Sequence, residues 1–345
     1  MTYKQFIDET VEQISLLYDS AEGRALAARL LQHFCGVSSY EHIVEPYGAV
    51  AEECLPLLQN AAQQLAVARP IQYIIGYQEF LGRRFSVEEG VLIPRPETEE
   101  LVRWVIEKVG KRCAVDDKTK ENKCNSINDK ESVINNNSRE YTINGSCVEK
   151  LRIIDAACGS GSIAVSLAAS LPQSQIYALD ISEKALEVTR RNSEALLPDP
   201  SQVKIFRYDL LAEEDSLKYK SSALRNDFGD GEVSCGDDSA LKVDVIVSNP
   251  PYVTNSEKGA MQKNVVDYEP EEALFVPDEE PLIFYKALER FASQWLKPGG
   301  AIFLEINERF GSETSAIFKE AGYTNIEIRQ DIFGRERMIC AHRAY

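Results

Sequence analysis

Residues 249–252 read Asn-Pro-Pro-Tyr and are the part of this chain best suited to chemistry. The apolar residues 245–247 just before them predict a buried strand. Asn249 precedes a proline, which favours an extended backbone, and the two prolines have no N–H to donate. The loop therefore presents acceptors, because the side-chain oxygen of Asn249 and the carbonyl of Pro250 can each accept one hydrogen of a planar NH2 group. The ring of Tyr252 can cover the flat face of that group.

A nitrogen held in this way would keep its out-of-plane electrons directed at an electrophile. An amide nitrogen is a very poor nucleophile, so positioning and withdrawal of charge must supply most of the rate. The proton would leave during or after the transfer. A simpler interpretation is that Asn-Pro-Pro-Tyr is a turn after a strand, since Asn and Pro are common turn residues. The loop alone leaves both interpretations open.

A second candidate site lies upstream, where residues 151–155 predict a short buried strand and residues 163–169 predict a helix. The small residues between them would let the backbone approach a ligand closely. A strand, a glycine-rich turn and a helix N-terminus together are typical of a nucleotide-binding corner. The next predicted strand, 175–180, ends in Asp180, whose carboxylate is placed to accept the hydroxyls of a ribose.

Residues 159–164 also fit the dinucleotide fingerprint of nicotinamide dehydrogenases, which is a weak signal. Asp155 argues against that class. It lies at the mouth of the glycine-rich turn, where a carboxylate would repel a pyrophosphate but attract the positively charged amino acid end of S-adenosylmethionine. A dehydrogenase also has no use for the Asn249 loop. The turn, Asp180 and the loop together point to a methyltransferase that acts on nitrogen.

Further motifs extend over nearly the whole chain. They occupy residues 70–76, 79–85, 91–99, 268–275, 296–300 and 331–337, and the segment 91–99, Val-Leu-Ile-Pro-Arg-Pro-Glu-Thr-Glu, is the most distinctive. In these motifs the chain resembles the peptide chain release factor glutamine methyltransferases, the PrmC/HemK family. The resemblance implies an enzyme that transfers a methyl group from S-adenosylmethionine to the side-chain amide nitrogen, N5, of the glutamine in the Gly-Gly-Gln motif of class I release factors.

The resemblance also implies roles for individual residues. The methionine part of the cofactor would be held by Asp155, Ala157, Cys158, Gly159, Ser160 and Gly161, the ribose by Asp180, and the adenine by Asp209 and Leu210. Arg95, Glu97 and Thr98 would fold over the cofactor, and Asn249 would contact it. The catalytic residues would be Asn249, Pro250 and Tyr252, and the substrate-binding residues would be the same three with Pro251.

Some of these assignments have structural alternatives. Asp209 could equally cap a surface helix. Glu97 follows Pro96, and this pair suits the first turn of a helix, a role compatible with the cofactor role. The family usually has glycine at the position of Ala157 and threonine at that of Cys158. Because alanine disfavours a left-handed backbone, strain is expected at Ala157 if the turn requires that conformation.

Periodicity predicts an α/β chain in three parts. Residues 1–70 carry helical spacing and predict a small N-terminal helical domain, and residues 71–93 alternate as a β-hairpin linker does. The resemblance implies a substrate-docking role for the first domain. It also implies that residues 94–345 form an S-adenosylmethionine-dependent, class I methyltransferase domain, with a Rossmann-like sheet of seven mostly parallel strands and an antiparallel last strand. Residues 114–149 and 212–241 have few apolar groups and predict disordered insertions.

Strands alternate with helices in the methyltransferase domain, which favours a parallel sheet. Beyond those already described, strands are expected at 203–207, 300–306, 325–329 and 337–341, and helices from about 97 and near 182–195, 281–296 and 312–321. The glycine-rich turn, Asp180, Asp209 and Asn249 would then share the carboxyl edge of the sheet, where open α/β sheets bind ligands.

Composition bears on the remaining alternatives. The formal net charge of -17 disfavours a protein that clamps bare nucleic acid, and it suits a basic protein partner. The main alternative is an amino methyltransferase of adenine N6, cytosine N4 or guanine N2, which uses a similar loop but needs a basic cleft or a target-recognition domain. Neither cysteine spacing nor the scattered histidines predict a metal site. We find no signal peptide, long apolar span or heptads, and therefore expect a cytoplasmic monomer that does not enter membranes.

Overall fold

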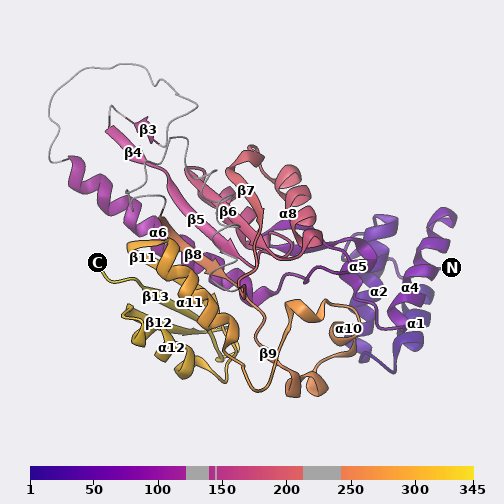
Figure 1. The fold of residues 1–345 in the computed structure, drawn as a ribbon. Coiled ribbons are helices and arrows are strands. Elements are labelled where there is room, and N and C mark those ends of the chain that lie inside the picture. Colours follow the sequence, from indigo (N-terminus) through magenta and orange to yellow (C-terminus); the bar gives the residue numbers. More distant parts are fainter. Residues whose placement is uncertain (122–139, 144–145, 213–241) are drawn as a thin grey trace. The chain divides into compact units, whose positions relative to one another are not determined.

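The computed structural model describes residues 1–121, 140–143, 146–212 and 242–345. These residues form two compact units (Figure 1). The first unit comprises Met1–Gln78, Ser86–Ile93 and Glu257–Glu271, and the second comprises Glu79–Phe85, Pro94–Ser256 and Glu272–Tyr345.

The two insertions expected from the sequence fall largely outside the described residues. Of the range 114–149, the structure describes the end of helix α6 (Pro96–Glu121) and the strands β3 (Glu140–Ile143) and β4 (Ser146–Glu149), which pair antiparallel. Of the range 212–241, it describes only Ala212.

The first unit is built from short helices. They are α1 (Tyr3–Ile14), α2 (Ser20–Cys35), α3 (Glu41–Val44), α4 (Leu55–Ala66), α5 (Ile71–Ile75) and α10 (Lys263–Val266), with the 3-10 turn η1 (Glu52–Cys54). Local sequence sets the helix ends, since Thr2 and Gln5 form a capping box at α1 and Asp19 caps α2. Gly36 ends α2 in the left-handed conformation. The apolar faces of α1, α2 and α4 meet in one buried core.

A later segment completes the first unit. The hydroxyl of Tyr268 donates to the carbonyl oxygen of Val67 at 2.8 Å. The buried carboxylate of Glu269 accepts the backbone N–H of Ile93 at 3.0 Å. The chain therefore returns to the first unit shortly after the Asn-Pro-Pro-Tyr loop. The sequence pattern does not predict this return, because the contacts join residues far apart in the chain.

A short β-hairpin follows α5. Its strands, β1 (Tyr77–Phe80) and β2 (Arg83–Ser86), form a two-stranded sheet. The turn residues Leu81 and Gly82 both have positive φ, 48° and 73°, which is the backbone that a two-residue hairpin turn of type I′ requires. The strands cover only part of the expected hairpin range, because Ile71–Ile75 is helical.

The second unit contains a seven-stranded sheet of order β12-β13-β11-β8-β5-β6-β7. Its strands are β5 (Leu151–Ala156), β6 (Ser174–Asp180), β7 (Val203–Arg207), β8 (Val243–Ser248), β11 (Leu296–Glu305), β12 (Thr324–Gln330) and β13 (Glu336–His342). Strands β11, β8, β5, β6 and β7 run parallel, whereas β13 is antiparallel to both of its neighbours. The expected α/β fold, with a mostly parallel sheet and an antiparallel last strand, is confirmed.

Helices cover both faces of this sheet. The remaining elements of the second unit are α7 (Ser162–Ser170), α8 (Glu183–Leu196), α11 (Ile283–Trp295), α12 (Gly311–Glu320), η2 (Pro200–Gln202), β9 (Val253–Thr254) and β10 (Phe275–Val276), and η3 (Asn255–Ala260) and η4 (Glu271–Ala273) lie at the unit boundaries. The helices expected near 182–195, 281–296 and 312–321 are thus present, with ends shifted by one or two residues.

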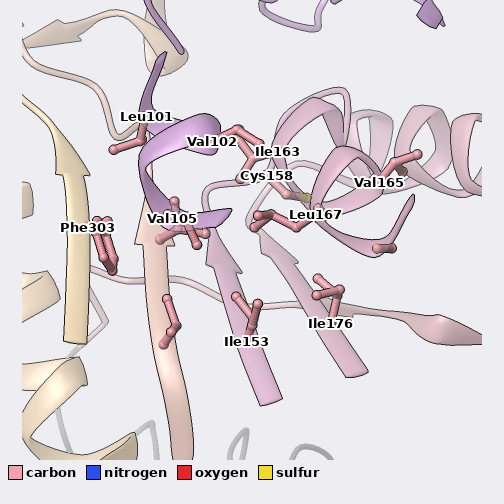
Figure 2. Close-up of a cluster of buried hydrophobic side chains, with 14 of the residues drawn as sticks. Leu101, Val102, Val105, Ile153, Cys158, Ile163, Val165, Leu167, Ile176 and Phe303 are labelled. Atoms are coloured by element: carbon pink, nitrogen blue, oxygen red, sulfur yellow. The ribbon is translucent and has the colours of Figure 1, made fainter. Parts of the chain in front are cut away.

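Side chains alternate between the two faces of the sheet, as they must along a strand. On one face, Ile153, Ile176 and Phe303 pack with Leu101 of α6 and Ile163 of α7 (Figure 2). The adjacent residues of the same strands face α11 and α12. This three-layer packing holds the strands in a fixed register, so the loops at their carboxyl ends start from fixed points.

Within the described ranges, none of the helices has both the length and the apolar character needed to cross a lipid bilayer. In the same part of the chain, no group of three or more His, Cys, Asp or Glu side chains is arranged to hold a metal ion.

Candidate active site

The parallel strands end at one edge of the sheet, and the loops after them carry the residues selected from the sequence. The glycine-rich turn follows β5, Asp180 ends β6, Asp209 follows β7, and the Asn-Pro-Pro-Tyr loop follows β8. Because the carboxyl ends of parallel strands lie together, this edge is the candidate active site.

The glycine-rich turn uses a left-handed backbone at three positions. Gly159 and Gly161 have φ of 55° and 76°, and Ala157 also has a positive φ, 61°. Glycine adopts this conformation readily, whereas alanine is strained by about 1–2 kcal/mol. The strain that the sequence suggested at Ala157 is therefore present. At Gly161 a side chain is also excluded sterically, because an added Cβ would lie 2.8 Å from Cγ2 of Thr189.

Two side chains of helix α8 donate hydrogen bonds to the turn. The hydroxyl of Thr189 donates to the carbonyl oxygen of Gly159 at 3.0 Å, and Nδ2 of Asn192 donates to that of Ser160 at 2.8 Å. Both side chains are buried. Neither residue was selected from the sequence, although polar residues spaced three apart on the buried face of an amphipathic helix are a recognisable signal.

Asp180 joins the turn to the neighbouring strand. Its Oδ2 accepts the backbone N–H of Gly159 and its Oδ1 that of Ser182, each at 2.9 Å. A carboxylate has about four lone-pair positions, so Asp180 can still accept ribose hydroxyls. Burial raises the pKa of Asp180. Cys158 is buried below the turn, and its backbone N–H donates to the carbonyl oxygen of Leu179 at 2.9 Å.

Asp155 has one unsatisfied oxygen at this corner. Its Oδ2 accepts the backbone N–H of Ala164, in the first turn of α7, at 2.9 Å. Its Oδ1 is buried and has no hydrogen-bond partner among the described residues. Burial raises the pKa of Asp155 well above its usual range, and the charge of Asp180 raises it further. A buried, uncompensated carboxylate favours a cationic group nearby, so this corner fits the ammonium group of S-adenosylmethionine.

Asp209 and Leu210 lie where β7 leaves the sheet. Oδ1 of Asp209 accepts the backbone N–H of Leu211 at 2.9 Å, so this carboxylate caps the turn after the strand. Leu210 is partly buried against the core. Among the described residues Asp209 thus stabilises a turn, and both the helix cap proposed as its alternative role and the contact of these two residues with adenine stay predictions.

Hydrogen bonds from distant segments hold the Asn-Pro-Pro-Tyr loop. Nδ2 of Asn249 donates to Oγ1 of Thr98 at 3.0 Å, and that hydroxyl donates to Oε2 of Glu305 at 2.7 Å. The hydroxyl of Tyr252 donates to the other carboxylate oxygen, Oε1 of Glu305, at 2.8 Å. Nδ2 of Asn307 donates to the backbone carbonyl of Tyr252 at 3.1 Å. The loop, the start of α6 and the end of β11 therefore form one network.

Glu305 sets the direction of the hydrogen bonds in this network. An ionised carboxylate only accepts, so both hydroxyls that touch it must donate to it. The hydroxyl of Thr98 then has only lone pairs left for Asn249, which must use its NH2 group. As a result, Oδ1 of Asn249 is left to accept a hydrogen from a substrate, the role expected of it from the sequence.

The charge of Glu305 is buried and partly compensated. Burial raises its pKa, while the hydrogen bonds from Thr98 and Tyr252 and the positive charge of Arg337 oppose that shift. The guanidinium carbon of Arg337 lies 5.9 Å from the centre of the Tyr252 ring. Glu305 was not selected from the sequence, where its signal is an acidic residue at the end of an otherwise apolar strand.

The remaining selected residues flank the network. The carbonyl oxygen of Arg95 accepts the backbone N–H of Thr98 at 3.1 Å, and Glu97 lies in the first turn of α6. The helix-start alternative for this segment is therefore observed. Pro250 and Pro251 are buried. The contacts of these residues with cofactor or substrate stay predictions.

Known proteins resemble this chain in sequence. Residues 147–258 match the family model described as a methyltransferase domain. The release factor glutamine methyltransferase of Bacteroides thetaiotaomicron is 37% identical over 286 residues, which cover 83% of this chain and 80% of the relative. The chain belongs to the release factor glutamine methyltransferase family. The resemblance inferred from its motifs is confirmed.

A second relative has the same name. The release factor glutamine methyltransferase of Flavobacterium psychrophilum is 31% identical over 339 residues, which cover 98% of this chain and 98% of the relative. Among solved structures, the release-factor-specific protein-(glutamine-N5) methyltransferase of Alicyclobacillus acidocaldarius aligns with a TM-score of 0.34 at 20% identity, covering 76% of this chain and 100% of that one.

The substitution Ala157→Gly should stabilise the protein. It removes strain of about 1–2 kcal/mol from the folded state. Glycine also raises the conformational entropy of the unfolded chain, which costs about 0.5–1 kcal/mol, so the free energy of unfolding should rise by roughly 0.5–1 kcal/mol. Thermal unfolding would show it as a higher Tm. The matched change Gly161→Ala should lower the Tm, because it adds strain and a clash with Thr189. A lower Tm for Ala157→Gly would contradict the strain at this position.

The pH dependence of turnover should report Glu305. With cofactor and substrate saturating, kcat should fall as the pH drops through the raised pKa of Glu305, because a protonated carboxyl can donate and no longer fixes the direction of the Thr98 hydroxyl. Glu305→Gln, which cannot titrate, should have a lower kcat and lack this acid limb. An unchanged acid limb in Glu305→Gln would assign it to another group.

Proposed function

We propose that this chain transfers the methyl group of S-adenosylmethionine to the side-chain amide nitrogen of the glutamine in the Gly-Gly-Gln motif of class I release factors. The observation that carries this proposal is the fixed orientation of Asn249, whose nitrogen is engaged by Thr98 at 3.0 Å and whose oxygen is left to accept. Family membership supports the class of substrate.

The chain contributes by holding and polarising the amide. Oδ1 of Asn249 and the carbonyl oxygen of Pro250 accept its two N–H hydrogens, fix its plane and stabilise the positive charge that develops on its nitrogen. Tyr252, anchored to Glu305 through its hydroxyl, places its ring against the amide. S-adenosylmethionine supplies the methyl group as an electrophile. The amide nitrogen gives up one proton during or after the transfer.

The cofactor is assigned to the corner formed by β5 and β6. Asp155 and the turn from Ala157 to Gly161 hold the methionine part, and Asp180 accepts the ribose hydroxyls. Asp209 and Leu210 flank the adenine, and Arg95, Glu97 and Thr98 lie over the cofactor. The unsatisfied oxygen of Asp155 and the remaining lone pairs of Asp180 support this arrangement.

The first unit is assigned to docking of the release factor. It exposes four large side chains close together in sequence, Tyr40, Ile43, Val44 and Tyr47, with 68–77% of their surface accessible. The spacing of Tyr40, Ile43 and Val44 puts these three on one side of the α3 turn, and Tyr47 follows shortly after the helix ends. Large apolar side chains gathered in solvent are typical of a protein interface. The net charge of -17 supports a basic protein partner and no direct contact with nucleic acid.

The substitution Asn249→Ala should lower kcat by roughly two orders of magnitude. The loss of one preorganised hydrogen bond to a developing charge costs about 3 kcal/mol in the transition state. The affinity for S-adenosylmethionine, measured by calorimetry, should change much less. Asn255→Ala, at an exposed asparagine a few residues further on, serves as the control and should leave kcat unchanged. Near-normal turnover by Asn249→Ala would contradict the role given to this residue.

The choice of substrate is tested by following the label from methyl-labelled S-adenosylmethionine. The purified protein is incubated separately with a class I release factor, with its Gly-Gly-Gln→Gly-Gly-Ala variant, and with duplex DNA or RNA. Mass spectrometry should find the label on the glutamine amide and none in the variant. Label on nucleic acid alone would favour the amino methyltransferase alternative, and no label on any substrate would contradict a catalytic role.

A further inference from the structure

The turn between β12 and β13 carries two large apolar side chains in solvent. Ile332 is 74% exposed and Phe333 is 68% exposed, and they are consecutive at the tip of the turn. Single exposed apolar residues are common on proteins, but two adjacent large ones cost solvation that a binding partner would recover.

The turn does not need these side chains for its own structure. The backbone N–H of Gly334 donates to the carbonyl oxygen of Asp331 at 2.9 Å, and Gly334 has a φ of 79°. Oδ1 of the buried Asp331 accepts the backbone N–H groups of Phe333 at 2.9 Å and Arg335 at 3.0 Å. These bonds define the turn whatever the side chains at its tip, and turns ordinarily carry polar residues there.

The turn contacts α6 on one side and, through Arg337, the ring of Tyr252 on the other. The backbone N–H of Ile332 donates to Oε1 of Glu100 at 3.3 Å, and Glu100 lies on α6, the helix whose first turn carries Thr98. On the other side, Nε of Arg337 lies 3.4 Å from Oδ2 of Asp331. The same guanidinium faces the ring of Tyr252, as described above. The two apolar side chains are therefore held at a fixed place beside the loop that grips the amide.

We propose that Ile332 and Phe333 form a docking surface for the main chain of the release factor on either side of the methylated glutamine. This inference rests on the proposed function. A glutamine side chain has only two methylene groups, so the substrate backbone must come close to the loop that holds its amide. The neighbouring glycines have no side chains to bury, so the apolar contact area must come from the enzyme. An aromatic ring can lie flat against such an open backbone.

The double variant Ile332→Ser/Phe333→Ser tests the inference. With an intact class I release factor as substrate, its kcat/KM should fall by about tenfold or more, mostly through a higher KM, as expected when two apolar contact residues are lost. Its Kd for S-adenosylmethionine and its Tm should match those of the wild type. The matched control Ile332→Val/Phe333→Tyr keeps the apolar surface and should retain kcat/KM within about twofold.

Two outcomes would overturn this inference and leave the proposed function standing. One is an unchanged kcat/KM for the serine variant with an active wild type. The other is a loss of cofactor affinity or of Tm that accounts for the lower activity, which would give the pair a structural role. A wild-type enzyme that leaves the release factor unmodified would instead overturn the proposed function, and this inference with it.

Discussion

The buried carboxylate of Glu305 is the constraint on which the rest of the site depends. Because it can only accept hydrogen bonds when ionised, it makes donors of the hydroxyls of Thr98 and Tyr252, which touch it at 2.7 and 2.8 Å. Thr98 in turn makes a donor of the Asn249 amide. One charge at the end of β11 thereby decides which atom of Asn249 faces a substrate, and it anchors the tyrosine of the same loop.

The hydrogen-bond network around Glu305 depends on the fold to bring its members together. A buried carboxylate is unfavourable unless hydrogen bonds and a nearby positive charge compensate it, and Glu305 has two hydroxyl donors and the charge of Arg337. Thr98 and Glu305 are 207 residues apart in the chain. They meet because α6 packs on the sheet and because β8 and β11 are parallel neighbours that end at the same edge. The three-layer core thus positions the chemistry.

Part of this could be predicted from the sequence. The apolar runs and the turns after them located the strands, and with them Asp180 and Asn249 at strand ends. The order of the strands came from family resemblance, because periodicity carries no information on which strands are neighbours. Glu305 and Thr189 carry only weak local signals, an acid at the end of an apolar strand and a polar residue on the buried face of a helix, and each becomes significant only when its distant partner is known. For the same reason the return of residues 257–271 to the first unit had no local signal.

A double-mutant cycle between Thr98→Val and Asn249→Ala, read in kcat at saturating substrates, tests the central claim most directly. If Thr98 acts by orienting the Asn249 amide, Thr98→Val should lower kcat in the wild-type background and have almost no further effect once Asn249 is alanine. The coupling between the two sites would then equal nearly the whole effect of Thr98→Val. Independent, additive losses would contradict the claim, and would show that Thr98 acts on the cofactor or on the fold without passing through Asn249.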